Sequence, residues 1–166
     1  MIKKILTTMM ACTFVFSSTA NAQDPVKSTD DAYSMGVYYK DRDYKMVPSI
    51  DGVDGTGAKI SFLVPITKGI DYVFLAGRDE YIKDLDIYIY DETNALILKD
   101  RRSSSRAGVK FRASYTGTVR VILHVARANG LGAWSVIVGR RGGGERLDPV
   151  DPNAGAGAAP AQDNGQ

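Results

Sequence analysis

The chain has 166 residues, 44% of them hydrophobic, with 21 basic and 19 acidic residues, one histidine and one cysteine. The near balance of charge excludes the basic excess by which nucleic-acid-binding proteins displace counterions from phosphates, so no nucleic-acid partner is expected. A single histidine also excludes the common zinc sites, provided that the cysteine is absent from the mature chain.

Residues 1–22 predict a cleavable signal peptide. Lys3 and Lys4 precede an apolar run at residues 5–16, and small residues follow up to Ala22. A charged start, an apolar core and a small-residue cleavage site are typical of exported proteins, whereas a buried N-terminal helix would leave the lysines unexplained. The apolar run spans about a dozen residues, and a transmembrane helix needs roughly 20. We expect cleavage after Ala22, a periplasmic or secreted product and no transmembrane anchor.

Cys12 raises the alternative of a lipoprotein, but Met9, Met10 and Ala11 lack the leucine that usually precedes a lipidated cysteine. A chain that starts at Gln23 has no cysteine, so disulfides and thiol chemistry are not expected. Removing the two leader lysines leaves 19 basic residues, equal to the 19 acidic ones.

Residues 23–57 are polar and rich in turn-forming residues, and we expect a lead-in segment with one strand near Val37. The Asp and Gly residues of the cluster at 51–57 are similar to those of a calcium loop. The EF-hand pattern, however, requires oxygen ligands at its third and fifth positions and Glu at its twelfth. Val53, Gly55 and Phe62 occupy those positions here, so the cluster predicts an ordinary loop.

Residues 58–141 alternate between apolar and polar residues with a period of two, which is typical of strands with one buried face. Turn-forming residues separate the runs, and no helical pattern lies between them. We therefore predict one all-β domain, a small antiparallel jelly-roll-like β-sandwich. The apolar runs fall at residues 60–64, 72–76, 85–89, 95–98, 109–113, 119–125 and 134–138.

Residues 142–166 are dominated by Gly, Ala, Pro and polar residues, with Leu147 and Val150 as the larger apolar side chains. Such a composition buries too little surface to offset the entropy of ordering, so we predict a disordered tail. A tether to the cell wall or to a partner is the alternative.

The domain resembles the bacterial pre-peptidase C-terminal domain, a small jelly-roll-like sandwich of secreted bacterial proteins. The resemblance covers about half of the chain, and its distinctive parts are the run DLDIYIYD and the corner at residues 115–118. It implies substrate or matrix binding, sometimes with calcium, or help in secretion and folding. Because no protease domain accompanies it here, we expect a stand-alone module. The resembling segments are residues 70–77 (IDYVFLAG), 84–91 (DLDIYIYD), 99–100, 109–125 and 132–139 (GAWSVIVG).

Three aspartates in the DLDIYIYD run, Asp84, Asp86 and Asp91, predict a calcium site, with Asp100 nearby in the sequence. Calcium prefers six to eight oxygen ligands, and side chains two apart on a strand share one face. In the alternative, Asp84 and Asp86 accept hydrogen bonds from neighbouring loops and Asp91 starts a β-turn.

Tyr88 and Tyr90 share the face of Asp86 and predict a binding platform for sugar or peptide, because their rings combine apolar area with a hydroxyl. In the alternative, which the tyrosine-rich composition of residues 23–57 favours, the two rings pack beneath that segment.

A basic loop with Arg101, Arg102 and Arg106, followed by Lys110 and Arg112, predicts contacts with anionic lipid, lipopolysaccharide or an acidic partner. A solvated hairpin loop is the alternative. His124 is expected at the surface, and no serine near the loop shows the setting of an activated nucleophile.

These features predict an exported, non-enzymatic binding or accessory module with a protein or carbohydrate partner in the envelope. The alternative is an envelope-associated assembly protein that docks through its basic loop and tail. A third hypothesis is that the protein is an enzyme, which would need acid/base groups such as Asp84 and Asp86 held together in a pocket.

Overall fold

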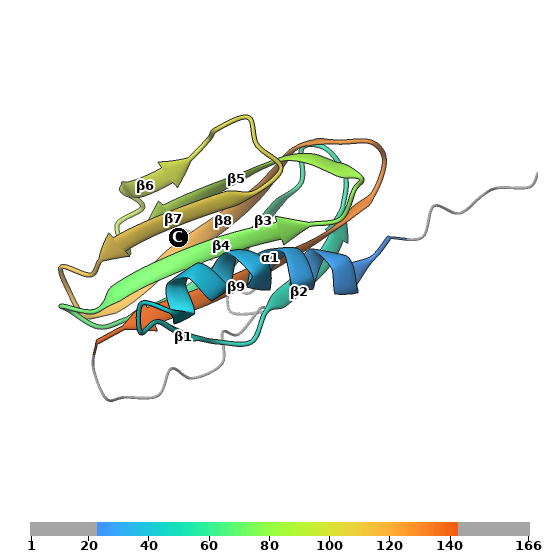
Figure 1. The fold of residues 1–166 in the computed structure, drawn as a ribbon. Helices are drawn as coiled ribbons and strands as arrows, with labels where there is room; N and C mark the ends of the chain where they lie inside the picture. The colour runs from blue at the N-terminus through green and yellow to red at the C-terminus, as the bar shows by residue number, and fades with distance from the viewer. Residues whose placement is uncertain (1–22, 143–166) are drawn as a thin grey trace, which may run out of the picture.

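The computed structural model describes residues 23–142, so the predicted signal peptide and all of the predicted tail except Gly142 lie outside it. Two antiparallel sheets pack face to face, and one helix lies against the outside of one sheet (Figure 1). The predicted all-β sandwich is confirmed, and each of the seven predicted strands is present.

The covered sheet, so named because the helix packs on it, has the order β1-β9-β4-β7, with β2 also paired to β9. The open sheet has the order β3-β8-β5-β6. The covered sheet consists of β1 (Lys45–Met46), β2 (Ile50–Asp54), β4 (Asp71–Arg78), β7 (Ala107–Arg112) and β9 (Gly132–Arg141). The open sheet consists of β3 (Lys59–Ile66), β5 (Ile82–Tyr90), β6 (Leu96–Asp100) and β8 (Gly117–Ala128).

The main core lies between the two sheets. Alternate residues of each strand point inward, as the period of two predicts, and burying each large aliphatic side chain contributes about 1.5–3 kcal/mol. The largest inward side chains are Phe62, Tyr72, Phe74, Ile82, Leu85, Ile87, Ile89 and Leu123.

A helix, α1 (Pro25–Lys40), occupies the place of the predicted strand near Val37, so that prediction is wrong. The Asp24 side chain accepts a hydrogen bond from the Lys27 backbone N–H at 2.9 Å, which caps the first turn. Pro25 suits a first turn, where its missing N–H costs nothing, and Lys40 in the last turn is favourable for the helix dipole.

Small residues allow α1 to lie directly on the covered sheet. Ser28, Ala32 and Gly36 recur every fourth residue and form the buried stripe of the helix. A Cβ built on Gly77 of β4 would stand 2.2 Å from the Ala32 backbone nitrogen. The contact therefore requires a residue without a side chain at that point. A second, smaller core between helix and sheet contains Ala32, Tyr44, Val73, Leu75 and Ile137.

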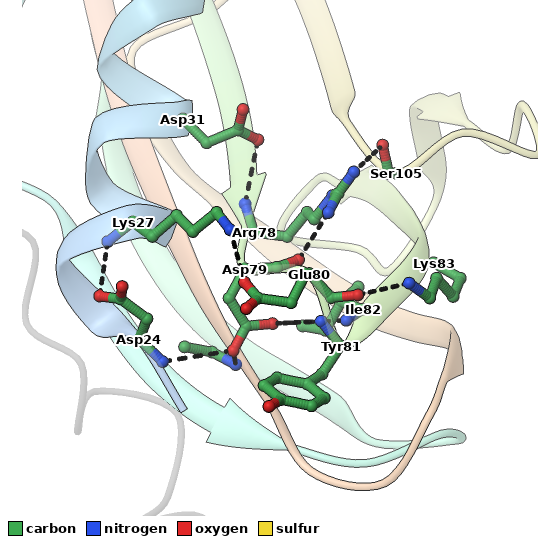
Figure 2. A network of polar contacts seen from close by, with 11 residues as sticks. Asp24, Lys27, Asp31, Arg78, Asp79, Glu80, Tyr81, Ile82, Lys83 and Ser105 are labelled. Atoms are coloured by element: carbon green, nitrogen blue, oxygen red, sulfur yellow. Dashed lines mark hydrogen bonds and ion pairs between the residues drawn. The ribbon is translucent and has the colours of Figure 1, made fainter. Parts of the chain in front are cut away.

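A polar network fastens the start of α1 to the sandwich (Figure 2). The Asp79 carboxylate, which is fully buried, accepts hydrogen bonds from the backbone N–H groups of Ala133 at 2.8 Å and Tyr81 at 2.9 Å. Longer contacts of 3.4 Å join it to the N–H groups of Asp24 and Ile82. One carboxylate thus links the helix cap, the start of β5 and β9.

The predicted loop at residues 51–57 is wrong in its first half, where Asp51 to Asp54 belong to β2 and pair with β9. The reason is a tertiary contact. A Cβ on Gly52 would stand 2.2 Å from the Trp134 ring, and Asp54 accepts a hydrogen bond from Trp134 Nε1 at 2.8 Å. Gly52 therefore leaves room for the Trp134 ring. The turn propensity of residues 51–57 carries no information on this contact with a distant strand, so it predicts a loop.

Candidate functional site

The outer face of the open sheet carries Tyr88 and Tyr90. The helix packs on β4 and β9 of the covered sheet instead, as Figure 1 shows. The expectation that both rings lie beneath residues 23–57 is therefore wrong, and both tyrosines are partly exposed. As the sequence predicts, both side chains lie on the outward face of β5, opposite the buried Ile87 and Ile89.

Strand pairing arranges this outer face as three rows that cross β3, β8 and β5. In an antiparallel pair, residues directly opposite each other share a face. The first row is Lys59, His124 and Asp86, the second is Ser61, Ile122 and Tyr88, and the third is Leu63, Arg120 and Tyr90. Lys99 of β6 lies opposite Tyr88 and extends the second row.

A shallow hollow of about 320 Å³ lies on these rows, and we name it the tyrosine hollow. Its volume is at the lower end of the range for small-molecule sites, and its apolar and polar side chains converge from four segments of the chain. The residues that line it are Lys59, Tyr88, Tyr90, Arg101, Ile122 and His124.

Asp86 lies beneath the hollow with 5% of its surface exposed. Its Oδ2 accepts a hydrogen bond from the Tyr88 hydroxyl at 3.3 Å and lies 3.1 Å from His124 Nδ1. Because a carboxylate only accepts, His124 donates this hydrogen bond from Nδ1. Burial raises the pKa of Tyr88, and the charge of Asp86 raises it further. The pair of hydrogen bonds thus holds Tyr88 and His124 in place.

Two cations line the hollow and two more lie near it. Lys59 and Arg101 line it, Lys99 lies beside Tyr88, and the Arg120 guanidinium carbon lies 5.0 Å from the centre of the Tyr90 ring. None of the four forms an ion pair with another residue of the described range 23–142. The rim of the hollow is therefore positively charged.

The other two arginines of the predicted basic loop, Arg102 and Arg106, do not line the hollow, and each is paired with a carboxylate. Arg102 Nε donates to Asp100 Oδ1 at 3.0 Å, and Arg106 Nε donates to Asp31 Oδ1 on α1 at 2.8 Å. These hydrogen bonds raise the pKa of each guanidinium. Of the three arginines predicted to bind a ligand, the structure places only Arg101 at the hollow with the tyrosines.

The three aspartates predicted to bind calcium are not brought together. Asp84 accepts a hydrogen bond from the Ser104 N–H at 3.0 Å, and Asp86 serves Tyr88 and His124 as above. Asp91 accepts from the N–H groups of Thr93 and Ala95, which forms the turn between β5 and β6. Within residues 23–142, no three carboxylate or histidine side chains are grouped to hold a metal ion. Calcium binding stays a prediction, without a clustered ligand set to support it.

Lys59, Lys99, Arg120 and Ile122 also belong to this surface, and the sequence did not single them out as ligand-binding residues. Each one alternates with buried or partly buried neighbours, so its outward direction could be predicted from the period of two. The order of the strands in the sheet could not be predicted, because alternation along a strand carries no information on which strand lies beside it. The missing signal is therefore the pairing of β8 with both β3 and β5.

No protein-family model and no curated protein match the chain. Among solved structures, the chain is similar to PliG of Aeromonas hydrophila, a periplasmic inhibitor of g-type lysozyme. The two share 8% identity with a TM-score of 0.45, over 60% of this chain and 90% of the other. The resemblance to the pre-peptidase C-terminal domain stays a prediction. In the described range 23–142, no helix is long and apolar enough to cross a membrane.

Proposed function

We propose that this chain is an exported, non-enzymatic binding protein that holds its ligand in the tyrosine hollow. One observation carries the proposal: α1 covers the outer face of one sheet, while the other sheet exposes a hollow with two tyrosines and a charged rim. Aromatic rings with polar tips are favourable where one side of a contact is apolar and the other is wet. The signal-peptide pattern at residues 1–22 supports export, and the resemblance to an accessory domain of secreted proteins agrees with a binding role.

The arrangement beneath the hollow favours binding over catalysis. The Asp86 carboxylate is buried and already accepts from Tyr88 and His124, so it orients these side chains for a ligand. Acid/base catalysis by Asp84 and Asp86 would require both carboxylates at one pocket. The two carboxylates instead accept hydrogen bonds from different segments, because Asp84 accepts from the Ser104 N–H and Asp86 from the Tyr88 hydroxyl.

The alternative role, envelope assembly through the basic loop and tail, has less support. Arg102 and Arg106 are paired with Asp100 and Asp31, so their charge is compensated within the fold. Arg101 is the arginine of this loop that lines the hollow. The loop therefore supports ligand binding at the hollow more than a separate docking surface.

The test is to apply the purified protein to arrays of oligosaccharides and of peptides. We expect the wild type to bind a defined subset, and a Tyr88→Ala/Tyr90→Ala variant to lose that binding. Tyr33→Ala is the matched control, because Tyr33 is an exposed tyrosine on α1 at the other sheet. Binding that survives in the double variant would place the site elsewhere, and the absence of binding to both arrays would contradict the proposed function.

A further inference from the structure

The tyrosine hollow has a marked excess of positive charge in a chain whose acidic and basic residues are nearly balanced. Lys59 and Arg101 line the hollow, whereas the one carboxylate in the three rows, Asp86, is 5% exposed. Asp86 also accepts hydrogen bonds within the fold, from His124 at 3.1 Å and from the Tyr88 hydroxyl at 3.3 Å. The excess faces solvent, so it is available to a ligand of opposite charge.

Arg120 lies beside the tyrosine hollow, in a neighbouring hollow that Asp91 and Glu92 also line. Its guanidinium stacks on the Tyr90 ring, and one Nη donates to the Asn94 side-chain oxygen at 2.7 Å. Its remaining N–H groups have no acceptor among the described residues. Asp91 and Glu92 weaken the attraction of an anion to Arg120, so Lys59 and Arg101, which line the tyrosine hollow, are the cations available to an anionic ligand.

The position of the hollow favours a saccharide over a peptide. Extended peptides bind sheets by adding a strand at an edge, where backbone groups are unpaired. The hollow instead lies over β8 and β5, each of which is paired on both sides. Only side chains are available there: a tyrosine ring for the apolar face of a sugar, and His124 Nε2 to form a hydrogen bond with a hydroxyl.

We propose that the tyrosine hollow binds an acidic saccharide, with a sugar ring of the ligand against Tyr88 and the ligand's carboxylates against Arg101 and Lys59. This inference rests on the proposed function and adds the chemical class of the ligand to it. The positive charge favours an anionic ligand. Because β5 and β8 are each paired on both sides, the ligand must be recognised by side chains and not by backbone groups.

The experiment is calorimetric titration of the full exported protein with tetragalacturonate, with its fully methyl-esterified form, and with tetraglutamate. We expect tetragalacturonate to bind, with a Kd that rises as salt is added, because exposed charges are screened. Esterification removes the negative charge but keeps the rings, and we expect it to weaken binding by about tenfold or more. Tetraglutamate should bind far more weakly, because it lacks the sugar ring.

Charge variants locate the contact. Arg101→Gln and Lys59→Gln alter exposed side chains that make no hydrogen bond to other residues in 23–142, so the fold should be unaffected. Each is expected to raise the Kd for tetragalacturonate by about threefold to tenfold. Arg112→Gln is the matched control, because Arg112 is an exposed arginine of β7 in the covered sheet. Its Kd should equal that of the wild type.

The outcomes separate this inference from the proposed function. Equal binding of the acid and its ester, lost in Tyr88→Ala, would overturn the anionic class and leave a neutral sugar site. Stronger binding of tetraglutamate through the same cations, Arg101 and Lys59, would overturn the proposal of a saccharide ligand and leave a peptide site. Binding that Arg101→Gln and Lys59→Gln leave unchanged would overturn the location. If none of the three compounds binds while the arrays identify another ligand, this inference fails and the proposed function stands.

Discussion

Asp79 is a buried residue on which three backbone segments converge, although no motif marks it. Its buried carboxylate accepts from Ala133 and Tyr81 and contacts the N–H groups of Asp24 and Ile82. Buried N–H groups without an acceptor cost about 1–3 kcal/mol each. The carboxylate therefore sets the local structure where three segments of the chain meet.

The Asp79→Ala variant is expected to lose about 3 kcal/mol of unfolding free energy, because at least two buried N–H groups lose their acceptor. Urea denaturation followed by Trp134 fluorescence measures the change. Glu80→Ala is the neighbouring control, since that exposed side chain forms a surface ion pair with Lys27. Equal stability of Asp79→Ala and wild type would contradict the role given to the network.

A second residue-scale effect concerns pH. Burial raises the pKa of Asp100, but hydrogen bonds from Arg102 and from the Gly108 N–H outweigh it and leave the pKa below the ordinary 3.8. A folded-state pKa below the unfolded one stabilises the protein above about pH 3.8, and this contribution is lost as the pH falls through the folded pKa.

The Asp100→Asn variant is expected to be less stable than wild type by about 1–2 kcal/mol at neutral pH, because charge-assisted hydrogen bonds are lost. The difference should shrink when unfolding is measured well below pH 3.8. A stability difference that is the same at both pH values would show that the charge of Asp100 is not involved.

At the scale of the element, the strands of residues 58–141 could be predicted because burial on one face writes a period of two into each of them. Helix α1 could not be predicted from apolar periodicity. Its buried stripe consists of Ser28, Ala32 and Gly36, which carry almost no hydrophobic signal. Their spacing of four was the available indication, and its meaning depends on Gly77 in a strand far along the chain.

The Gly77→Ala variant is expected to weaken the docking of α1. The added methyl group would stand within 2.2–2.7 Å of Ala32 and Ser28 backbone atoms, so helix or strand must shift, at about 1–3 kcal/mol. Far-UV circular dichroism during urea denaturation measures the change. Gly55→Ala is the control, since its Cβ would meet nothing closer than 3.5 Å. A Gly77→Ala variant as stable as this control would contradict the close packing.

At the scale of the whole molecule, the structure consists of three layers: α1, the covered sheet and the open sheet. A helix on one outer face leaves the opposite outer face as the larger sheet surface with side chains exposed to solvent. The sequence predicts that Tyr88 and Tyr90 share a face, but which layer covers that face is a property of the assembled fold. The positive rim arises in the same way, since its cations come from β3, β6, β8 and the segment after β6.

The central claim is that the ligand binds on the open sheet and not on the helix side. It is tested most directly by recording amide chemical shifts of the ¹⁵N-labelled protein while tetragalacturonate is added. We predict shift changes that concentrate at residues 86–90 of β5 and 120–124 of β8, with Lys59 and Arg101 affected and α1 unchanged. Changes confined to α1 and β9, or spread evenly over both sheets, would contradict the claim.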